Sequence, residues 1–457
     1  MTVTNAPKMI TSRWDLDDGH TLARYEETGG YQGLRNALER SPDEVVEEVR
    51  SASLLGRGGA GFPAGVKWGF CPPGVWPRYL VINGDESEPG TYKDRILMER
   101  DPHQLIEGAL ITAYAVGCAQ VFLYVRGEMA LAQERIGQAL NDAYAAGYVG
   151  KNILGTDFSV DVVLHGGAGA YIVGEETALI ESLEGNRGMP RLKPPFFPAA
   201  KGYFMQPTIV NNVETVSNLP WIFANSAADY VTYGAENSRG TRLFAVSGHI
   251  RNPGVYEVEF GVTTFRDLIY APEYGGGIRN DRELKAFIPG GVSAPWLYPE
   301  HLDTPLETGA VGDLGTMLGS GAVIVFDEDT DMVKACLRIL RFFARESCGK
   351  CTPCREGTSW MEKIVQRIIA GDGRSDDLNL VLDVADNISV GLAWPPTQTT
   401  ICPLGQSATS PLASAIIRFR DEFEAYIGAP ASVDVTVRGA AFVGPVTSSP
   451  GEEPVDV

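Results

Sequence analysis

The stretch YLVINGDESEPG, residues 79–90, decides the fold of this chain. Its first four residues are apolar, and an Asn-Gly pair and several carboxylates follow directly. Such a run predicts a short buried strand with polar groups at its carboxyl end. In open α/β sheets, ligands bind outside the carboxyl ends of the strands. Asp and Glu in this position suit sugar or ribityl hydroxyls and would repel phosphate, although a solvated turn is the simpler explanation when the acids are taken alone.

Strands and helices continue to alternate downstream of this stretch. The clearest helix starts at Pro102 with Asp101 as its cap, because both residue types are favoured at these positions. The alternation predicts a mainly parallel sheet in an α/β domain that covers residues 1–240. The predicted strands are 79–82, 121–125 and 160–164, and the predicted helices are 102–117, 130–146 and 175–183.

Two further units and a tail follow in the sequence. Predicted strands at 243–247, 254–258 and 322–326, with a short helix at 263–270, indicate a small α+β unit over residues 241–328. Apolar residues at helical spacing then predict a four-helix bundle over residues 329–430. Its helices are expected to start near 332 and to cover about 356–370, 376–387 and 407–427. Residues 431–457 are rich in Pro, Ser, Gly and acids and are predicted to be disordered.

The segment ESCGKCTPCREG, residues 346–357, carries three cysteines at two-residue spacing. Cys348, Cys351 and Cys354 can bind one metal ion or cluster together from a tight loop between two bundle helices. Thiolates select iron–sulfur clusters or zinc, and a C-x-x-C-x-x-C run opens the ferredoxin-type cluster pattern. Cys402 is the best fourth ligand because the bundle can bring its loop to the same end, and Cys336 is a minor rival. A zinc site of four cysteines remains the alternative.

A glycine-rich segment, GRGGAGFPAG, occupies residues 56–65. It matches G-x-G-x-x-G, but a helix is predicted before it where a dinucleotide fingerprint needs a strand. No Gly-Lys-Ser/Thr ends it, so it is not a P-loop. Its glycines still allow backbone N–H groups to approach a phosphate, with Arg57 and Lys67 adding positive charge. An ordinary surface loop is an equally good interpretation of this segment alone.

A second glycine-rich segment, GGAGAYIVGEET, occupies residues 166–177 and places paired acids at a helix start. Acids in a first helical turn are usually just favourable to the helix dipole. Basic residues follow at Arg187, Arg191, Lys193 and Lys201. They could offset bound phosphates, or they could be plain loop residues.

The composition excludes several classes of protein. The chain has 457 residues and a formal net charge of −20, so nucleic acid and anionic membrane surfaces are not expected as primary partners. No apolar stretch is long enough to span a bilayer, and the N-terminus lacks the pattern of a secretory signal. Seven cysteines are few for this length and odd in number, which favours a reduced cytoplasmic setting over a disulfide framework.

In this order, the segments together resemble the flavoprotein subunit of respiratory NADH:quinone oxidoreductase, complex I. The segments that carry the resemblance are the glycine-rich loop through Lys67-Trp68, residues 83–91, 174–177 and 211–215, and the cysteine motif with Cys402. The resemblance covers about residues 20–430. It implies a Rossmann-like FMN- and NADH-binding domain, a ubiquitin-like β-grasp domain and a helical bundle that carries one [4Fe-4S] cluster.

The resemblance also implies roles for individual residues. FMN phosphate would lie on the glycine-rich loop and near three polar residues after a strand: Gly56, Arg57, Gly58, Gly59, Ala60, Gly61, Asn211, Asn212 and Thr215. The rest of the flavin would face Asn83, Asp85, Glu86, Gly174 and Glu175. NADH would contact Phe62, Lys67, Phe70, Glu88, Tyr171, Glu176, Lys193 and Phe196. Glu176 and Glu88 are the expected catalytic residues, and Cys348, Cys351, Cys354 and Cys402 are the expected cluster ligands.

The activity implied by the resemblance is hydride transfer from NADH to FMN, followed by single-electron transfer to the cluster and onward to quinone. The implied partners are a small [2Fe-2S] subunit and a large multi-cluster subunit, in a complex whose peripheral arm lies on the cytoplasmic side of a bacterial inner membrane. No direct membrane insertion is expected. One alternative is the diaphorase subunit of a soluble NAD-linked hydrogenase or formate dehydrogenase, which the small number of cysteines disfavours. Another is a non-catalytic, zinc-stabilised scaffold that binds a nucleotide.

Overall fold

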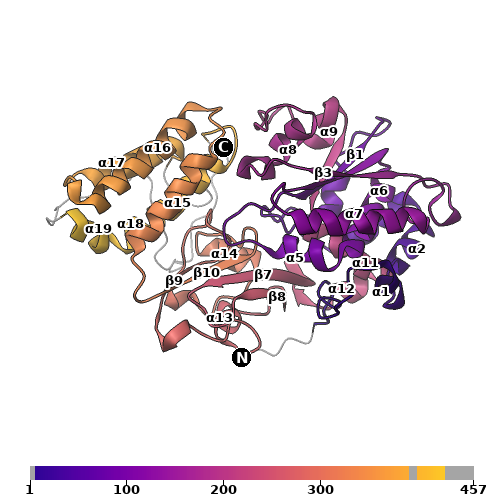
Figure 1. Ribbon diagram of the computed structural model, residues 1–457, viewed down its shortest axis with the longest axis horizontal. Helices are drawn as coiled ribbons and strands as arrows, with labels where there is room; N and C mark the ends of the chain where they lie inside the picture. Colours follow the sequence, from indigo (N-terminus) through magenta and orange to yellow (C-terminus); the bar gives the residue numbers. More distant parts are fainter. Residues whose placement is uncertain (1–5, 391–398, 428–457) are drawn as a thin grey trace, which may run out of the picture.

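The computed structural model describes residues 6–390 and 399–427 of the chain (Figure 1). It is a mixed α/β structure with three units arranged around one junction. The first unit runs to about residue 233, the second is a smaller sheet, and the third is helical. The predicted disordered segment 431–457 lies outside the described residues. Within the described part of the chain, every helix is too short or too polar to cross a membrane.

The first unit is built on a four-stranded parallel sheet with strand order β3-β2-β1-β4. Its strands are β1 Tyr79–Gly84, β2 Gln120–Val125, β3 Asp161–Gly166 and β4 Thr208–Asn212. Its longer helices are α3 Pro42–Ser51, α5 Lys93–Arg100, α6 Pro102–Val116, α7 Ala130–Ala145 and α8 Glu176–Leu183. The shorter ones are α1 Leu22–Glu27, α2 Gln32–Leu38, α4 Ala64–Trp68, α9 Pro198–Lys201, α10 Val213–Ser217, α11 Leu219–Ala224 and α12 Ala227–Tyr230, with 3-10 turns η1 Ile153–Gly155, η2 Tyr171–Gly174 and η3 Tyr203–Met205.

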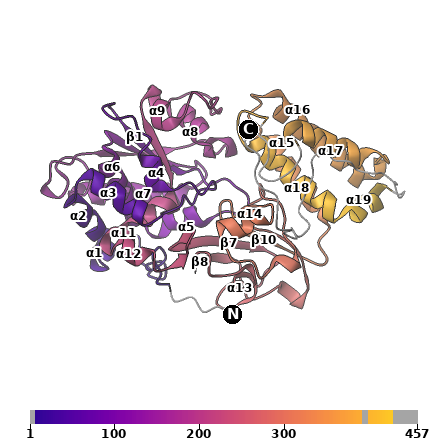
Figure 2. The same ribbon diagram turned by 180° about the vertical axis from the view of Figure 1, so that it is seen from behind.

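Side chains alternate between the two faces of this sheet, as the pleat requires. Leu80, Ile82 and Val121 pack with the helices α6 and α7 in one core. Val81 and Phe122 point to the other face and pack with residues of α8 in a second core, which extends into the helical unit. Figures 1 and 2 both show α8 on the side of the first unit that faces α15 and α16. The sheet is therefore covered on both faces, as a parallel sheet must be.

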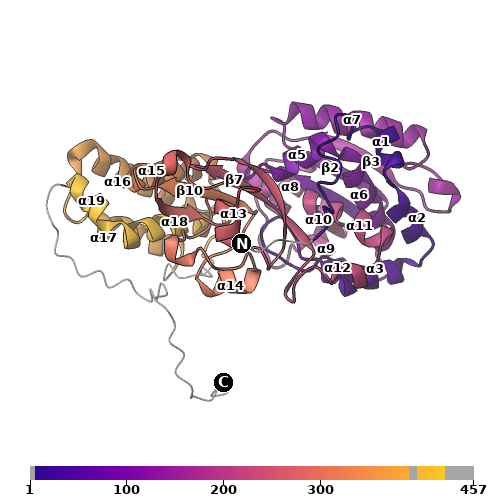
Figure 3. The same ribbon diagram turned by 90° about the horizontal axis from the view of Figure 1, so that it is seen from below.

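The second unit is a four-stranded sheet with strand order β8-β7-β10-β9. β7 and β10 are parallel, and both outer pairs are antiparallel. The strands are β7 Thr241–Gly248, β8 Gly254–Glu259, β9 Leu284–Ile288 and β10 Ala322–Asp327, preceded by the short pair β5 Gly234–Ala235 and β6 Ser238–Arg239. The helices are α13 Phe265–Tyr270 and α14 Thr308–Asp313, with 3-10 turns η4 Arg279–Asp281 and η5 Pro299–His301. Seen from below, β7 and β10 lie between the helical unit and the first unit (Figure 3).

The third unit consists of α15 Met332–Glu346, α16 Thr352–Arg367, α17 Asp377–Ile388, α18 Leu404–Arg418 and α19 Arg420–Ile427, with a short π-helix η6 Ile368–Asp372. The prediction of one helix over 407–427 was wrong, because Phe419 leaves helical geometry and separates α18 from α19. The prediction that all three close cysteines lie in a loop was also wrong in part: Cys354 is in the first turn of α16.

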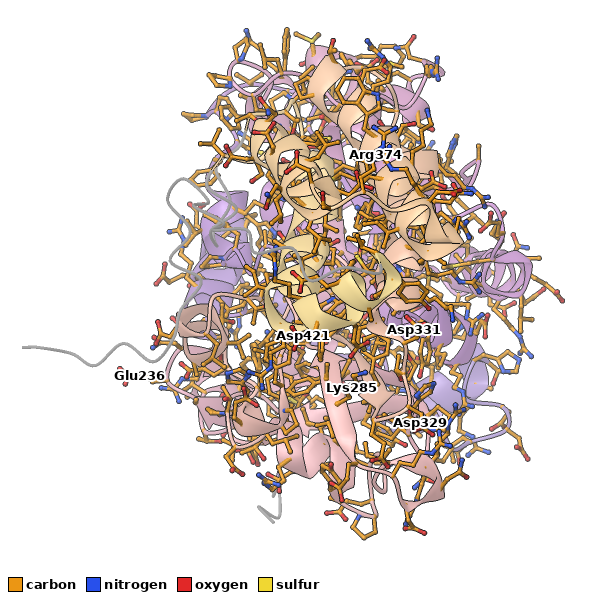
Figure 4. The ribbon with its side chains drawn as sticks, turned by 90° about the vertical axis from the view of Figure 1, so that its left-hand side faces the viewer. Glu236, Lys285, Asp329, Asp331, Arg374 and Asp421 are labelled. Atoms are coloured by element: carbon orange, nitrogen blue, oxygen red, sulfur yellow. The ribbon has the colours of Figure 1, made fainter. Side chains whose placement is uncertain are left out.

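Polar contacts hold the helical unit against the second unit. Lys285 of β9 forms an ion pair of 2.6 Å with Glu422 of α19 and donates to Thr330 O at 2.7 Å. Tyr426 Oη donates to Asp331 Oδ2 at 2.6 Å, which ties α19 to the start of α15. Figure 4 shows Lys285 and Asp331 close to Asp421 where these elements meet. These contacts fix the end of the bundle that is remote from the cysteines.

Candidate flavin and iron–sulfur site

A cavity of about 470 Å³ lies at the carboxyl end of β1, where the three units meet. Its volume is in the usual range for sites that bind small molecules and cofactors. Residues from all three units line it. From the first unit they are Arg57, Gly58, Gly59, Ala60, Asn83, Asp85, Glu86, Ser87, Glu88, Thr91, Lys93, Asp94, Tyr171, Ile172, Gly174, Glu175 and Asn212. From the second they are Gly290, Ser293, Met317, Gly319 and Ser320, and from the third Cys402, Pro403, Leu404, Gln406 and Ser407.

The glycine-rich loop forms one wall of the cavity. A Cβ on Gly58 would lie 3.0 Å from Asn212 Cβ, so only glycine lets the loop approach β4 this closely. Gly59 has φ of +147° and open space where a side chain would stand. The loop is held from behind, because Arg57 N donates to Thr215 Oγ1 at 2.9 Å. The backbone of this loop is therefore fixed in place and accessible from the cavity.

The Arg57 side chain runs away from the loop and into the junction with the second unit. It is fully buried and donates to Arg239 O at 3.1 Å and to Thr241 O at 3.0 Å. The guanidinium also stacks 4.5 Å above the Phe260 ring. Its described contacts therefore anchor the loop to the second unit.

Burial changes the acidity of two carboxyl groups at the end of β1. Asp85 is fully buried, and its Oδ1 has no hydrogen-bond partner among the described residues. Burial raises the pKa of Asp85 to about 7, although the Ser87 hydroxyl and Arg126 oppose this shift. Burial also raises the pKa of Glu86 to about 8. Its carboxylate accepts hydrogen bonds from the backbone N–H groups at the start of α5, so Glu86 has a capping role as well.

A second group of predicted residues forms an ion network beside the cavity. Lys193 Nζ lies 2.7 Å from Glu175 Oε1 and 3.3 Å from Glu176 Oε1, and Lys67 Nζ lies 3.2 Å from Glu176 Oε2. Burial alone would raise the pKa of Glu176, but the two lysines lower it below its ordinary value. Glu175 lines the cavity, whereas Lys67, Glu176 and Lys193 do not. This network continues the site outward from the cavity.

The predicted aromatic residues are available to a ligand. The rings of Phe62 and Phe70 lie 5.7 Å apart, and their exposed fractions are 45% and 54%. Phe196 is half-buried. Exposed aromatic faces of this kind can stack on a planar base.

Four other predicted residues lie outside the cavity lining. Trp68 Nε1 donates to Asn211 Oδ1 at 3.0 Å, so Asn211 is buried beneath the surface. Thr215 is also buried and holds the glycine-rich loop. Gly56 and Gly61 belong to the turn of this loop but lie outside the lining.

Electrostatic effects connect the predicted thiols of the helical unit. Burial raises the pKa of Cys354 to about 11, and Cys351 and Cys348 raise it further. Burial likewise raises the pKa of Cys402 to about 12, with added contributions from Cys354 and Cys348. Among the described residues, no three His, Cys, Asp or Glu side chains form a group suited to a single metal ion.

Sequence reasoning missed several residues of the cavity. Lys93 is buried and forms ion pairs with Asp94 at 2.8 Å and Glu214 at 2.7 Å. Burial alone would lower the pKa of Lys93, but these carboxylates raise it above its ordinary value. The charged pair directly after the acidic turn was a usable signal. No signal in the sequence pointed to Ser293, because only the fold brings its turn to the cavity.

Comparisons with known proteins agree with this arrangement. Residues 49–221 match the family model described as the Nuo51 FMN-binding domain. Residues 334–426 match the model described as the NADH-ubiquinone oxidoreductase-F iron-sulfur binding region. The cavity and the cysteines thus define a class of protein, a flavin- and iron–sulfur-binding oxidoreductase subunit. The match to an iron–sulfur region also favours a cluster over zinc at the four cysteines.

Two relatives identify the family of the chain. It is 47% identical over 427 residues to the F-type subunit of the NADH-quinone oxidoreductase of Mycobacterium bovis, covering 92% of this chain and 93% of the relative. It is 42% identical over 443 residues to the corresponding F-type subunit of Escherichia coli. That match covers 96% of this chain and 97% of the relative. The chain therefore belongs to the family of NADH-quinone oxidoreductase F subunits.

A solved structure has a similar fold. A chain of a NAD+-reducing [NiFe]-hydrogenase in the air-oxidised state matches with a TM-score of 0.77 and 36% sequence identity. The match covers 89% of this chain and 66% of the hydrogenase chain. This likeness supports the mixed α/β architecture with its parallel sheet.

Proposed function

We propose that this chain is the electron-entry subunit of an NADH-quinone oxidoreductase. It takes hydride from NADH at a bound FMN and passes electrons singly to a [4Fe-4S] cluster. One observation carries the proposal: the cavity that holds the glycine-rich loop and Asp85 is also lined by Cys402. A flavin in this cavity and a cluster on these thiols would be immediate neighbours.

The residues of the cavity fit FMN. The open backbone at Gly59 suits a phosphate, since it presents N–H groups without a side chain in the way. The unpartnered Asp85 Oδ1 suits a ribityl hydroxyl, because a buried acceptor needs a donor. Asn83, Glu86, Gly174 and Glu175 would line the rest of the flavin. When bound, FMN supplies the acceptor for hydride and the means to release electrons one at a time.

NADH would bind at the outer side of the cavity. Phe62 and Phe70 offer faces on which its adenine can stack, and Phe196 would add a further ring. Lys67 and Lys193 hold Glu176 as a carboxylate that can accept hydrogen bonds from ribose or nicotinamide. Glu88 and Tyr171 would meet the nicotinamide end. The protein supplies position and water exclusion here, not a nucleophile.

The thiols of Cys348, Cys351, Cys354 and Cys402 would hold the cluster. The raised pKa values of Cys354 and Cys402 describe the metal-free protein, and a cluster would bind the four cysteines as thiolates and release the protons. A soft donor set of four thiolates suits iron and sulfide.

We infer three domains and a place in a larger assembly. The strand order of the second sheet, with α13 packed on it, supports a β-grasp domain over residues 241–328, between a Rossmann-like domain 1–240 and a four-helix bundle 329–430. Electrons would leave to other subunits, a small [2Fe-2S] subunit and a large multi-cluster subunit. The complex would sit peripherally on the cytoplasmic side of a bacterial inner membrane.

The test is anaerobic purification of the full chain, with assay of flavin, iron and NADH:ferricyanide activity. We expect about one FMN and about four irons per chain and rapid reduction by NADH. A colourless protein that NADH does not reduce would overturn the proposal.

The second candidate is a diaphorase subunit of a soluble NAD-linked hydrogenase or formate dehydrogenase, favoured by the likeness to the hydrogenase chain. Both candidates share the NADH chemistry and differ in the electron acceptor. Co-purification of the native protein decides between them: a membrane-bound, quinone-reducing assembly supports the first, and a soluble hydrogenase or formate dehydrogenase supports the second.

A further inference from the structure

The second unit contributes to the cavity although it lies outside both matched family regions. Those regions are residues 49–221 and 334–426. Five cavity residues come from the segment between them: Gly290, Ser293, Met317, Gly319 and Ser320. Ser293 makes the most specific contact of the five, because it reaches a carboxylate of the first unit.

Three donors converge on the Glu88 carboxylate. Ser293 N donates to Glu88 Oε1 at 2.8 Å, and Ser293 Oγ donates to the same oxygen at 2.7 Å. Tyr171 Oη donates to the other oxygen, Oε2, at 2.7 Å. Both carboxylate oxygens are therefore engaged, and hydrogen bonds to a charged acceptor are the stronger kind. The plane of this carboxylate is fixed from two units of the molecule.

The turn that carries Ser293 is itself held firmly. Ser293 is 6% exposed. Thr316 Oγ1 donates to Pro295 O at 2.6 Å, and Ser320 N donates to Gly290 O at 3.1 Å. Trp296 N donates to Ser414 Oγ of α18 at 3.2 Å, so the helical unit also braces the turn. Ser293 thus presents its hydroxyl from a rigid support.

We propose that Ser293 is a positioning residue for NADH oxidation, which aims the Glu88 carboxylate at the nicotinamide end of the dinucleotide. This inference rests on the proposed function, which places Glu88 in the NADH site. Ser293 acts through Glu88, so it governs recognition of the nicotinamide half and leaves the ADP half unaffected. The second unit, which carries Ser293, is therefore part of the nucleotide site.

Binding of the nicotinamide half and of the ADP half can be distinguished with two ligands. One is NAD+, and the other is ADP-ribose, which lacks the nicotinamide. Binding of each to the oxidised holoprotein is measured by calorimetry. We expect Ser293→Ala to weaken NAD+ binding about tenfold, the scale of one lost hydrogen bond to a charged group, and to leave ADP-ribose binding unchanged. Flavin content should equal that of the wild type. Equal loss for both ligands, or no loss for either, would overturn the inference.

Matched variants separate positioning from general loosening. Thr316→Val removes the hydroxyl that holds the same turn without touching Glu88, and both affinities should stay at wild-type values. Ser293→Thr keeps the hydroxyl and should retain the wild-type ratio of the two affinities. In a Glu88→Gln background, Ser293→Ala should add less than about twofold, since coupled residues are not additive. A further tenfold loss in that background would show that Ser293 acts by another route.

A fallback variant and a check on the wild-type protein make each result of this experiment interpretable. If Ser293→Ala does not fold, Ser293→Gly also removes the hydroxyl and gives the same comparison of ligands. Failure of the proposed function has a different signature, because the wild-type protein would then bind no NAD+ and its flavin would not be reduced by NADH. A wild-type protein that does both, with no effect of Ser293 variants, contradicts this inference alone.

Discussion

At the residue scale, the polar groups of the site divide into those that face the cavity and those that hold them. Asp85 and Glu175 were recognisable only through the family resemblance, because acids at strand and helix ends commonly have structural roles: Glu175 caps α8 by accepting from Thr177 N and Ala178 N. The sequence could not distinguish Thr215 and Asn211 from ligand-binding groups, since only the fold shows that they bond to Arg57 and Trp68. Residue types near a site are thus predictable, whereas the direction of each side chain depends on contacts made across the sheet.

Glu176 is expected to serve NADH and not the flavin. It pairs with Lys67 and Lys193 beside the cavity and does not line it. We expect Glu176→Ala to raise the KM for NADH at least several-fold, because both lysines lose their shared partner. FMN should remain bound. Flavin content after a desalting column and steady-state NADH:ferricyanide kinetics measure the two effects, and loss of flavin would place Glu176 in the flavin site instead.

Asp85 should make stability depend on pH. Its folded-state pKa of about 7 lies above the ordinary value of 3.8, so the folded protein holds a proton that the unfolded chain has lost. Stability from this group is therefore fully present below about pH 4 and falls as the pH rises to about 7. In flavin-free protein, Asp85→Asn should raise the Tm by about 3 °C or more at pH 8 and change it little at pH 4. Thermal unfolding across this range checks it, and equal shifts at both pH values would contradict it.

At the scale of elements, predictions succeeded where an apolar run has clear start or stop signals. Helix α6 starts at Pro102, with Gln104 N donating to Asp101 Oδ1 at 3.2 Å, as its capping signals indicated. Helix α5 was missed because its buried faces carry charge: Lys93 and Asp94 are neutralised by partners that include residues distant in the sequence. Strand β9 was missed because it is short and interrupted by Lys285, whose charge the bundle compensates.

The loop before α18 should supply the fourth cluster ligand. Cys402 is 6% exposed and lines the cavity, and Cys354 and Cys348 both raise its pKa. We expect Cys402→Ala to abolish the EPR signal of the reduced cluster while NADH:ferricyanide activity survives, since the flavin can pass electrons directly to that acceptor. Cys336→Ala is the matched control, because this buried thiol lies within α15. An unchanged signal in the Cys402 variant would exclude this ligand.

At the scale of the whole molecule, function depends on how the three units are joined. The cavity has walls from each unit, so relative movement would open it. The sequence predicted the order of the units and could not predict this junction, because its contacts join residues far apart in the chain. Arg57 spans it from the first unit, and Lys285 spans the other boundary, between the second unit and α19.

These two junction contacts should differ greatly in strength. The Arg57 guanidinium is fully buried, stacks on Phe260 and donates to two backbone carbonyls of the second unit. Arg57→Lys keeps the charge but loses the planar group that makes these contacts together. We expect it to lower the free energy of unfolding by about 3 kcal/mol, because buried acceptors lose their donors. It should also speed the loss of FMN.

Lys285→Met is the matched control for that experiment. The Lys285–Glu422 pair is partly exposed, with side-chain exposures of 20% and 32%, so solvent screens it and its loss should cost less than about 1 kcal/mol. Chemical denaturation with flavin release followed by fluorescence measures both variants. A cost for Lys285→Met equal to that for Arg57→Lys would contradict the idea that the cavity junction is the boundary on which flavin retention depends. The packing of the second unit is tied to the cofactor site only if Arg57→Lys lowers stability and speeds flavin release while Lys285→Met does neither to a comparable extent.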